Sequence, residues 1–152
     1  MEPLTIARLF ENATERPVIY NGIPIVRVDF FPVKNGDILK VRFEGTNDHV
    51  RQGFLLKPQG TGNIVANGER LKVAVFWRDT APMEFFISVM GKKCDKLSVR
   101  NVWDSGHGTM MWVGDSAIIV EEIPKGRRYR CNDSEPNDDF SDIIFTIERV
   151  VE

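Results

Sequence analysis

Apolar and polar residues alternate with a period of two over most of the chain. In residues 38–43, for example, Leu39, Val41 and Phe43 alternate with basic residues, and residues 71–77 repeat the pattern. A period of two places successive side chains on opposite faces of a β-strand. Such runs recur at a spacing of about 8–12 residues between turn-forming residues, which is typical of an antiparallel sandwich or barrel.

An Asn-Gly pair separates strand-like runs at three points, residues 21–22, 35–36 and 67–68. Asn-Gly suits the two-residue hairpin turn, in which both central residues take positive φ. The sequence therefore predicts a β-hairpin at each of the three pairs.

The pattern predicts an all-β fold for residues 1–152, which we expect to form a single domain. We expect one antiparallel two-sheet sandwich of jelly-roll or Greek-key type with about 9–11 strands, and a closed barrel is the alternative. Two long runs, residues 23–33 and 71–77, each predict one continuous strand. Residues 4–12 fit either a short helix or a first strand, and we favour a strand or an irregular edge because the following sequence is so strongly β.

Charge and composition exclude some classes of protein. The chain has 20 Lys and Arg against 22 Asp and Glu, a net charge of −2. This balance lacks the basic footprint expected for binding nucleic acid or an anionic membrane. No run approaches the about 20 apolar residues of a membrane span, and the N-terminal residues do not resemble a secretion signal, so we expect a cytoplasmic protein. Cys94 and Cys131 lie far apart and predict two reduced thiols, with a single disulfide as the alternative.

Candidate ion chemistry is concentrated in one acidic segment, which precedes a strand-like run at residues 143–151. Its five carboxylates are Asp133, Glu135, Asp138, Asp139 and Asp142. Carboxylates crowded in this way repel one another, and Ca²⁺ relieves the repulsion by taking six to eight oxygen ligands. The five residues are therefore candidate Ca²⁺ ligands in a loop at residues 132–142.

Part of this segment, Asn137-Asp138-Asp139-Phe140-Ser141-Asp142-Ile143-Ile144-Phe145, resembles the D-x-D-F-N-D-hydrophobic ending of calcium-binding β-sandwich modules from bacterial adhesins. The resemblance is confined to about residues 137–146, and Ser141 stands where that family prefers Asn. It implies that Asp138, Asp139 and Asp142 are the foremost ligands, with Asp133 and Glu135 next, and that Phe140 packs beneath the ion.

A second interpretation of the segment is a solvated acidic loop neutralised by nearby basic residues. Four arginines flank it, Arg127, Arg128, Arg130 and Arg149. The EF-hand pattern does not apply, because counting from Asp133 gives neither Gly at the sixth position nor a carboxylate at the twelfth.

Motifs that suggest catalysis have simpler explanations. Gly114-Asp115-Ser116 matches the opening of a serine-hydrolase motif, but it lies late in β-type sequence with no His after it, so a turn is expected. His107 is close in sequence to Asp104 and Ser105, although a triad is defined by geometry in space. With only two histidines, His49 and His107, a His-based zinc site has little support. We therefore expect no enzyme activity and no cofactor other than Ca²⁺.

Aromatic residues provide the remaining candidate surface. Three tryptophans and two tyrosines could form a stacking platform for a sugar or a partner protein, although aromatic residues at period-two positions are usually core: Tyr20, Trp77, Trp103, Trp112 and Tyr129. The sequence predicts a non-catalytic binding module with a protein or carbohydrate partner, stabilised by Ca²⁺ at residues 132–142. The alternative is a structural protein that homo-oligomerises through its sheets.

Overall fold

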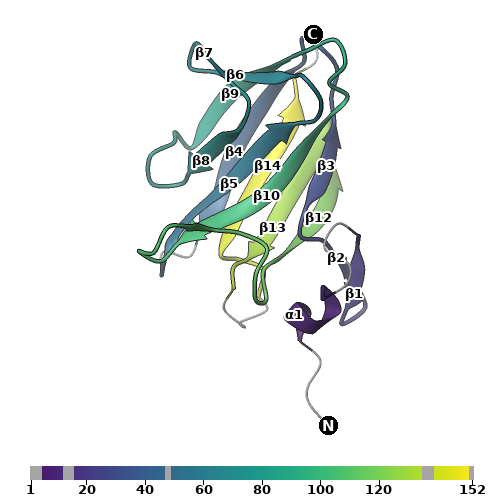
Figure 1. Ribbon diagram of the computed structural model, residues 1–152, viewed down its shortest axis with the longest axis vertical. Coiled ribbons are helices and arrows are strands. Elements are labelled where there is room, and N and C mark those ends of the chain that lie inside the picture. The colour runs from purple at the N-terminus through teal and green to yellow at the C-terminus, as the bar shows by residue number, and fades with distance from the viewer. Residues whose placement is uncertain (1–4, 12–15, 47–48, 135–138, 151–152) are drawn as a thin grey trace.

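A computed structural model describes residues 5–11, 16–46, 49–134 and 139–150 of the chain. In the described residues every paired strand is antiparallel to its neighbour, and the one helix is a single short turn (Figure 1). The all-β prediction is confirmed. No helix among the described residues is long and apolar enough to cross a membrane.

The helix α1 spans Ile6–Leu9, and fourteen strands follow it in the described residues. They are β1 (Val18–Tyr20), β2 (Ile23–Ile25), β3 (Asp29–Pro32), β4 (Ile38–Thr46), β5 (Arg51–Pro58), β6 (Asn63–Ala66), β7 (Glu69–Leu71), β8 (Ala74–Trp77), β9 (Glu84–Met90), β10 (Lys96–Asp104), β11 (Thr109–Met110), β12 (Ala117–Ile123), β13 (Gly126–Asn132) and β14 (Ile143–Arg149).

The strands form three sheets. β1 and β2 form a two-stranded sheet, and a seven-stranded sheet has the order β12-β13-β14-β4-β9-β6-β7. A five-stranded sheet has the order β11-β10-β5-β8, with β3 also paired to β10. Among the described strands, both large sheets end in edge strands, so they are open and do not close into a barrel. The two large sheets lie one over the other in a sandwich-like arrangement (Figure 1).

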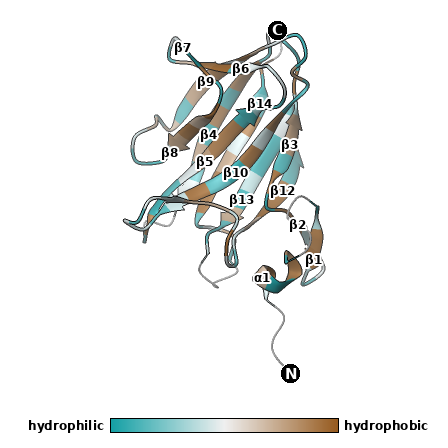
Figure 2. Ribbon diagram, in the orientation of Figure 1, coloured by the Kyte–Doolittle hydropathy of each residue, from teal (hydrophilic) through white to brown (hydrophobic). Residues whose placement is uncertain are grey.

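The main core lies between the two large sheets and is filled by apolar side chains from both. Figure 2 shows the alternation of hydrophobic and polar positions along the strands. Phe54 of β5 stacks on Phe145 of β14 with ring centroids 4.0 Å apart, and Tyr129 of β13 stacks on Phe145 at 5.1 Å. Each such side chain contributes about 1.5–3 kcal/mol through burial. The contact of Phe54 with Phe145 joins the two sheets, whereas Tyr129 and Phe145 stack within one sheet.

Two of the three Asn-Gly hairpins are confirmed. Asn21 and Gly22 have φ values of 50° and 78° and join β1 to β2, while residues 67–68 have φ values of 50° and 79° and join β6 to β7. The third prediction is wrong, since residues 35–36 connect β3 of the five-stranded sheet to β4 of the seven-stranded sheet. Of that pair, only Gly36 has positive φ.

The predicted range of 9–11 strands is too low, partly because two predicted strands are broken. Residues 71–77 divide because Leu71 pairs with Ile64 in the seven-stranded sheet, whereas Ala74 pairs with Leu56 in the other sheet. Residues 23–33 divide into β2 and β3. In residues 71–77 the core positions pass from Leu71 to Ala74 and Phe76, and Val75 is exposed, so the alternation changes phase at the crossing.

The N-terminal segment is helical, which corrects the prediction of a strand. The Thr5 side chain caps α1 by accepting a hydrogen bond from the Arg8 amide at 3.3 Å. Ile6 and Phe10, four residues apart, share one face and pack against a small second core with Ile25 and Phe140. This core lies at one end of the sandwich, near β1 and β2 (Figure 1).

Candidate functional site

The acidic segment brings two of its carboxylates together at one end of the seven-stranded sheet. Asp133 directly follows β13 and Asp142 directly precedes β14, and these two strands are paired. The Asp133 amide donates to Asp142 Oδ2 at 2.9 Å, and the Asp142 amide donates to the Cys131 carbonyl at 3.1 Å. Both side chains are buried, with exposures of 1% and 0%.

Two side chains from the start of β5 and the loop before it reach the same place. His49 Nε2 lies 2.8 Å from Asp133 Oδ2, and Gln52 Nε2 donates to the same oxygen at 2.9 Å. One ligand atom from each of His49, Asp133 and Asp142 lies within 4.8 Å of the others. This group of residues has the donor atoms and the spacing to hold a metal ion.

The other predicted ligands lie elsewhere or cannot be placed. Asp139 is exposed, and its Oδ1 accepts a hydrogen bond from the Ser141 amide at 3.2 Å. Glu135 and Asp138 lie outside the described residues. Phe140 is buried and packs in the small second core, and its amide donates to Asn132 Oδ1 at 3.3 Å. Of the five candidate ligands, the structure therefore brings Asp133 and Asp142 together.

The described ion pairs of the flanking arginines are not with the acidic segment. Arg127 pairs with Asp29 at 2.9 Å and with Glu122 at 2.8 Å, and Arg128 pairs with Glu44 at 3.0 Å. Arg149 donates to the Pro32 carbonyl at 2.6 Å. These contacts give Arg127, Arg128 and Arg149 partners on neighbouring strands, whereas Arg130 lines a small pocket together with Asp139. Because Glu135 and Asp138 lie outside the described residues, neutralisation of the segment by arginines stays a hypothesis.

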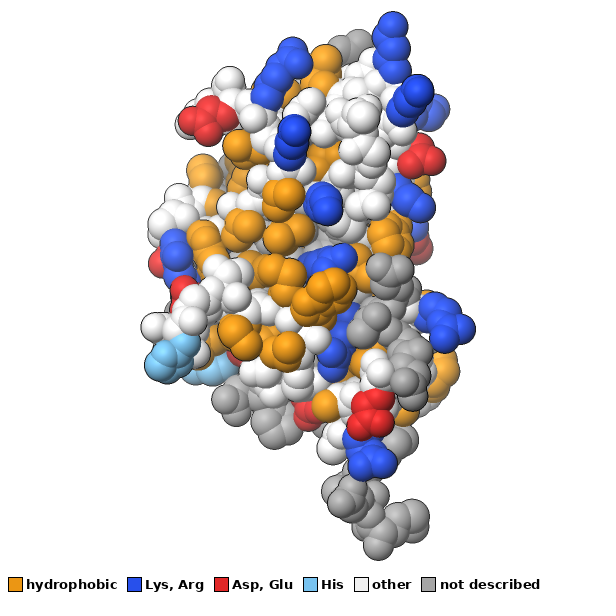
Figure 3. Space-filling model, in the orientation of Figure 1, with side chains coloured by type: hydrophobic (Ala, Val, Ile, Leu, Met, Phe, Trp, Pro, Cys, Tyr) orange, Lys and Arg blue, Asp and Glu red, His pale blue; other side chains and the backbone are white. Residues whose placement is uncertain are grey.

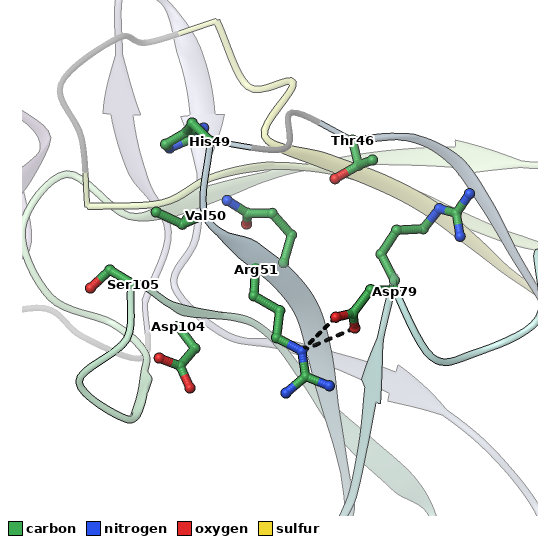
Figure 4. A pocket seen from close by; sticks show the side chains of 9 residues that line it. Thr46, His49, Val50, Arg51, Asp79, Asp104 and Ser105 are labelled. Atoms are coloured by element: carbon green, nitrogen blue, oxygen red, sulfur yellow. Dashed lines mark hydrogen bonds and ion pairs between the residues drawn. The ribbon is translucent and has the colours of Figure 1, made fainter.

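A cavity of about 700 Å³ adjoins His49 and gives its imidazole a path to solvent. Figure 4 shows His49 and Val50 on one side of this cavity, with Arg51 and Asp79 on another and Asp104 at the end of β10. Arg51 Nε bonds both Asp79 carboxylate oxygens at 3.0 Å. The cavity wall thus contains polar groups that already have fixed partners.

Neither sequence motif for catalysis places a nucleophile beside a base in the described residues. Asp104 Oδ1 accepts hydrogen bonds from the amides of Gly106 and Gly108 at 2.7 and 3.2 Å, so it organises its own loop. Ser116 is buried, and the neighbouring Asp115 Oδ1 accepts from the Ala7 amide at 3.0 Å. These carboxylates have structural roles here.

The tryptophans divide between interior and surface. Trp103 is buried, whereas Trp77 is half-buried and Trp112 is 39% exposed. Trp77 pairs with Gly53 of β5, and its ring covers this glycine. A Cβ added at Gly53 would come within 2.9 Å of the Trp77 ring. Arg100 lies 3.9 Å from the centroid of the Trp112 ring, and these stacked side chains lie on the outer face of the five-stranded sheet.

Apolar and basic residues dominate this outer face. Leu55 pairs with both Val75 and Arg100 across the sheet, so all three share the face. Figure 3 shows hydrophobic side chains gathered in its middle, with Lys and Arg among them and Asp and Glu mainly towards the edges. The outer face of the seven-stranded sheet carries paired charges such as Lys40 with Glu84 at 3.2 Å, together with the exposed ring of Phe86 opposite Lys40.

Sequence reasoning missed His49 and Gln52 as members of the polar group. Both lie far from the acidic segment along the chain, and only the packing of β5 against β13 and β14 brings them near. Comparison with protein-family models, curated proteins and solved structures gave no match. Function is therefore inferred from the geometry of the chain.

Proposed function

We propose that this protein is a non-catalytic binding module that contacts a partner protein through the outer face of the five-stranded sheet. In this proposal residues 1–152 form one domain, a two-sheet sandwich of jelly-roll or related Greek-key topology. The adjacency of β14 and β4, which are distant in the sequence, supports such a topology.

The observation that carries the proposal is the position of Trp112. Its φ is +44°, a region that costs a non-glycine residue about 1–2 kcal/mol. The buried guanidinium of Arg27 donates to the carbonyls of Trp112 and Gly114 and so fixes this turn. Burial lowers the pKa of Arg27, while Asp115 acts in the opposite direction. The fold thus holds a large aromatic ring partly in solvent at an energetic cost, and binding a partner would compensate for that exposure.

The composition of the face favours a protein over a carbohydrate. Trp and Arg are enriched in the cores of protein interfaces, and here the Arg100 guanidinium stacks on the Trp112 ring. Sugars stack on free aromatic faces, but Trp77 has Gly53 beneath it and the Arg51 guanidinium 4.3 Å from its ring centroid. Its ring faces are therefore already covered.

Charge favours a different protein over a second copy of this chain. The face carries Lys57, Lys96 and Arg100 together with its apolar residues. Packing two copies of it together would bring like charges close, which is unfavourable. A partner with acidic residues around an apolar centre is the complement, and assembly through this face is the alternative.

A photo-cross-linking amino acid placed at Val75 tests the proposal in the cell that makes the protein. Ile38, on the outer face of the other sheet, is the matched control, because the two side chains are similarly exposed, at 38% and 44%. We expect a discrete adduct with another protein from position 75 only, and its loss in Trp112→Ala. Adducts between copies of the chain would favour assembly, and equal adducts from both positions would contradict the proposal.

A further inference from the structure

The polar group formed by His49, Asp133, Asp142 and Gln52, in which all members except His49 are buried, is separate from the outer face. Asp133 and Asp142 are both buried, and His49 pairs with Asp133 at 2.8 Å. Burying carboxylates costs free energy unless charge partners or a metal compensate. A divalent cation would balance two such charges.

Gln52 supplies a separate observation that points to a ligand. It is 2% exposed, and its Oε1 has no hydrogen-bond partner among the described residues, although buried acceptors are usually satisfied. Gln52 Nε2 lies 2.9 Å from Asp133 Oδ2. The oxygen and nitrogen of one amide are about 2.3 Å apart, so Oε1 lies within about 5 Å of that carboxylate oxygen. An oxygen acceptor without a donor thus lies at the buried carboxylates.

The structure assigns a binding site for a divalent transition-metal ion to His49, Asp133, Asp142 and Gln52. Ca²⁺ and Mg²⁺ prefer ligand sets made of oxygen atoms, whereas imidazole together with carboxylates suits ions such as Zn²⁺ and Mn²⁺. The histidine therefore changes the metal expected from the acidic segment alone. Asp133 and Asp142 belong to the originally predicted set, and His49 and Gln52 are new.

The spacing suits such an ion after a small adjustment. Bonds of about 2.0–2.2 Å to nitrogen and oxygen keep any two ligands within about 4.4 Å of each other. The ligand atoms of His49, Asp133 and Asp142 lie within 4.8 Å. His49 lies partly in solvent, so rotation of its side chain can close the remaining gap, and the adjoining cavity admits the ion.

The bound ion would join the two large sheets. Gln52 belongs to β5 of the five-stranded sheet, and Asp133 and Asp142 lie at the ends of β13 and β14 in the other sheet. Backbone groups also position the carboxylates, since the Asp133 amide donates a hydrogen bond to Asp142 Oδ2. The site is thus a cross-link at one end of the sandwich.

Titration calorimetry and thermal melting of chelator-treated protein test this site. We expect one Zn²⁺ or Mn²⁺ ion bound per chain, and a melting temperature raised by about 5 °C or more at saturation. We expect Ca²⁺ and Mg²⁺ to bind at least about tenfold more weakly, because they gain little from the imidazole.

Two variants identify the ligands, and a third is the control. His49→Ala should weaken binding at least about tenfold, while His107→Ala, which removes the other histidine of the chain, should leave affinity unchanged. Gln52→Glu should lower the melting temperature of the metal-free protein by adding a third carboxylate, yet strengthen metal binding. Since His49 is not a core residue, its replacement should leave the fold intact.

Several results would overturn the site. These are the absence of one-to-one binding, equal losses in His49→Ala and His107→Ala, weaker binding by Gln52→Glu, or equal affinity for Ca²⁺. None of them concerns the outer face of the five-stranded sheet, so the two proposals fail separately.

Discussion

At the scale of single residues, the contact of Tyr129 with Asp29 is a polar anchor at the core. The Tyr129 hydroxyl donates to Asp29 Oδ2 at 2.7 Å, and Arg127 donates to the same oxygen at 2.9 Å. Burial and then Asp29 raise the pKa of Tyr129 well above its usual value. Although burial lowers the pKa of Arg127, pairing with Asp29 raises it overall. These three side chains join β13 to β3 and hence the two sheets.

Tyr129→Phe should reduce the free energy of unfolding by about 1.5–3 kcal/mol, because a hydrogen bond to a carboxylate is lost. The unfolded chain releases the tyrosine proton first, near pH 10, so wild-type stability should fall as pH rises above about 10. This fall should be smaller in the variant, where Cys131 still contributes. Urea unfolding at pH 8 and pH 10.5 measures both effects.

A double-mutant cycle with Asp29→Asn separates this contact from general packing. The two substitutions should be less than additive if Tyr129 and Asp29 interact directly. Full additivity would mean that the ring alone matters.

At the scale of elements, the conformation of the turn decides which strands become neighbours. The hairpins at residues 21–22 and 67–68 have positive φ at both positions, whereas residues 35–36 do not, and there the chain crosses to the other sheet. An Asn-Gly pair therefore marks a tight turn reliably, but it forms a hairpin only where both flanking strands belong to one sheet.

Gly68→Ala should destabilise the protein by about 1–2 kcal/mol, because an L-residue is strained at a φ of +79°. No atom lies within 4 Å of the added Cβ, so conformational strain is the whole effect. Gly45→Ala is the matched control, since the nearest atom is Ile144 Cδ1 at 3.9 Å and positive φ is absent. It should change stability by less than about 0.5 kcal/mol. Equal losses in thermal unfolding would refute the role of φ at Gly68.

At the scale of the whole molecule, the sandwich-like arrangement separates three environments. The interior is apolar and contains both cysteines, Cys94 and Cys131, as free thiols. One outer face carries paired charges beside the exposed Phe86, and the other carries aromatic, apolar and basic side chains. The stacked Trp112 and Arg100 make the second face the one to examine first for a partner.

Both thiols should resist labelling until the whole molecule unfolds. Burial and then Asp142 raise the pKa of Cys131 well above its usual value, which keeps the thiol protonated and unreactive. A thiol reagent should therefore detect no reactive group in the native protein at pH 8 and two after denaturation without reductant. Rapid native labelling of Cys94→Ala, which retains only Cys131, would contradict this burial.

The sequence by itself determined the local properties of the chain. Alternation at Leu39, Val41 and Phe43 determined a strand, since the pleat requires that period, and Asn-Gly at residues 67–68 determined a tight turn.

Tertiary packing determined the features that local sequence did not predict. Residues 6–9 became helical because a second core accepts the side chains of Ile6 and Phe10, and residues 71–77 divided because the two halves pair in different sheets. His49 and Gln52 lie beside Asp133 and Asp142 only because strands distant in the sequence pack together. The energy of that packing comes from contacts between the segments, so the sequence of one segment alone does not reveal it.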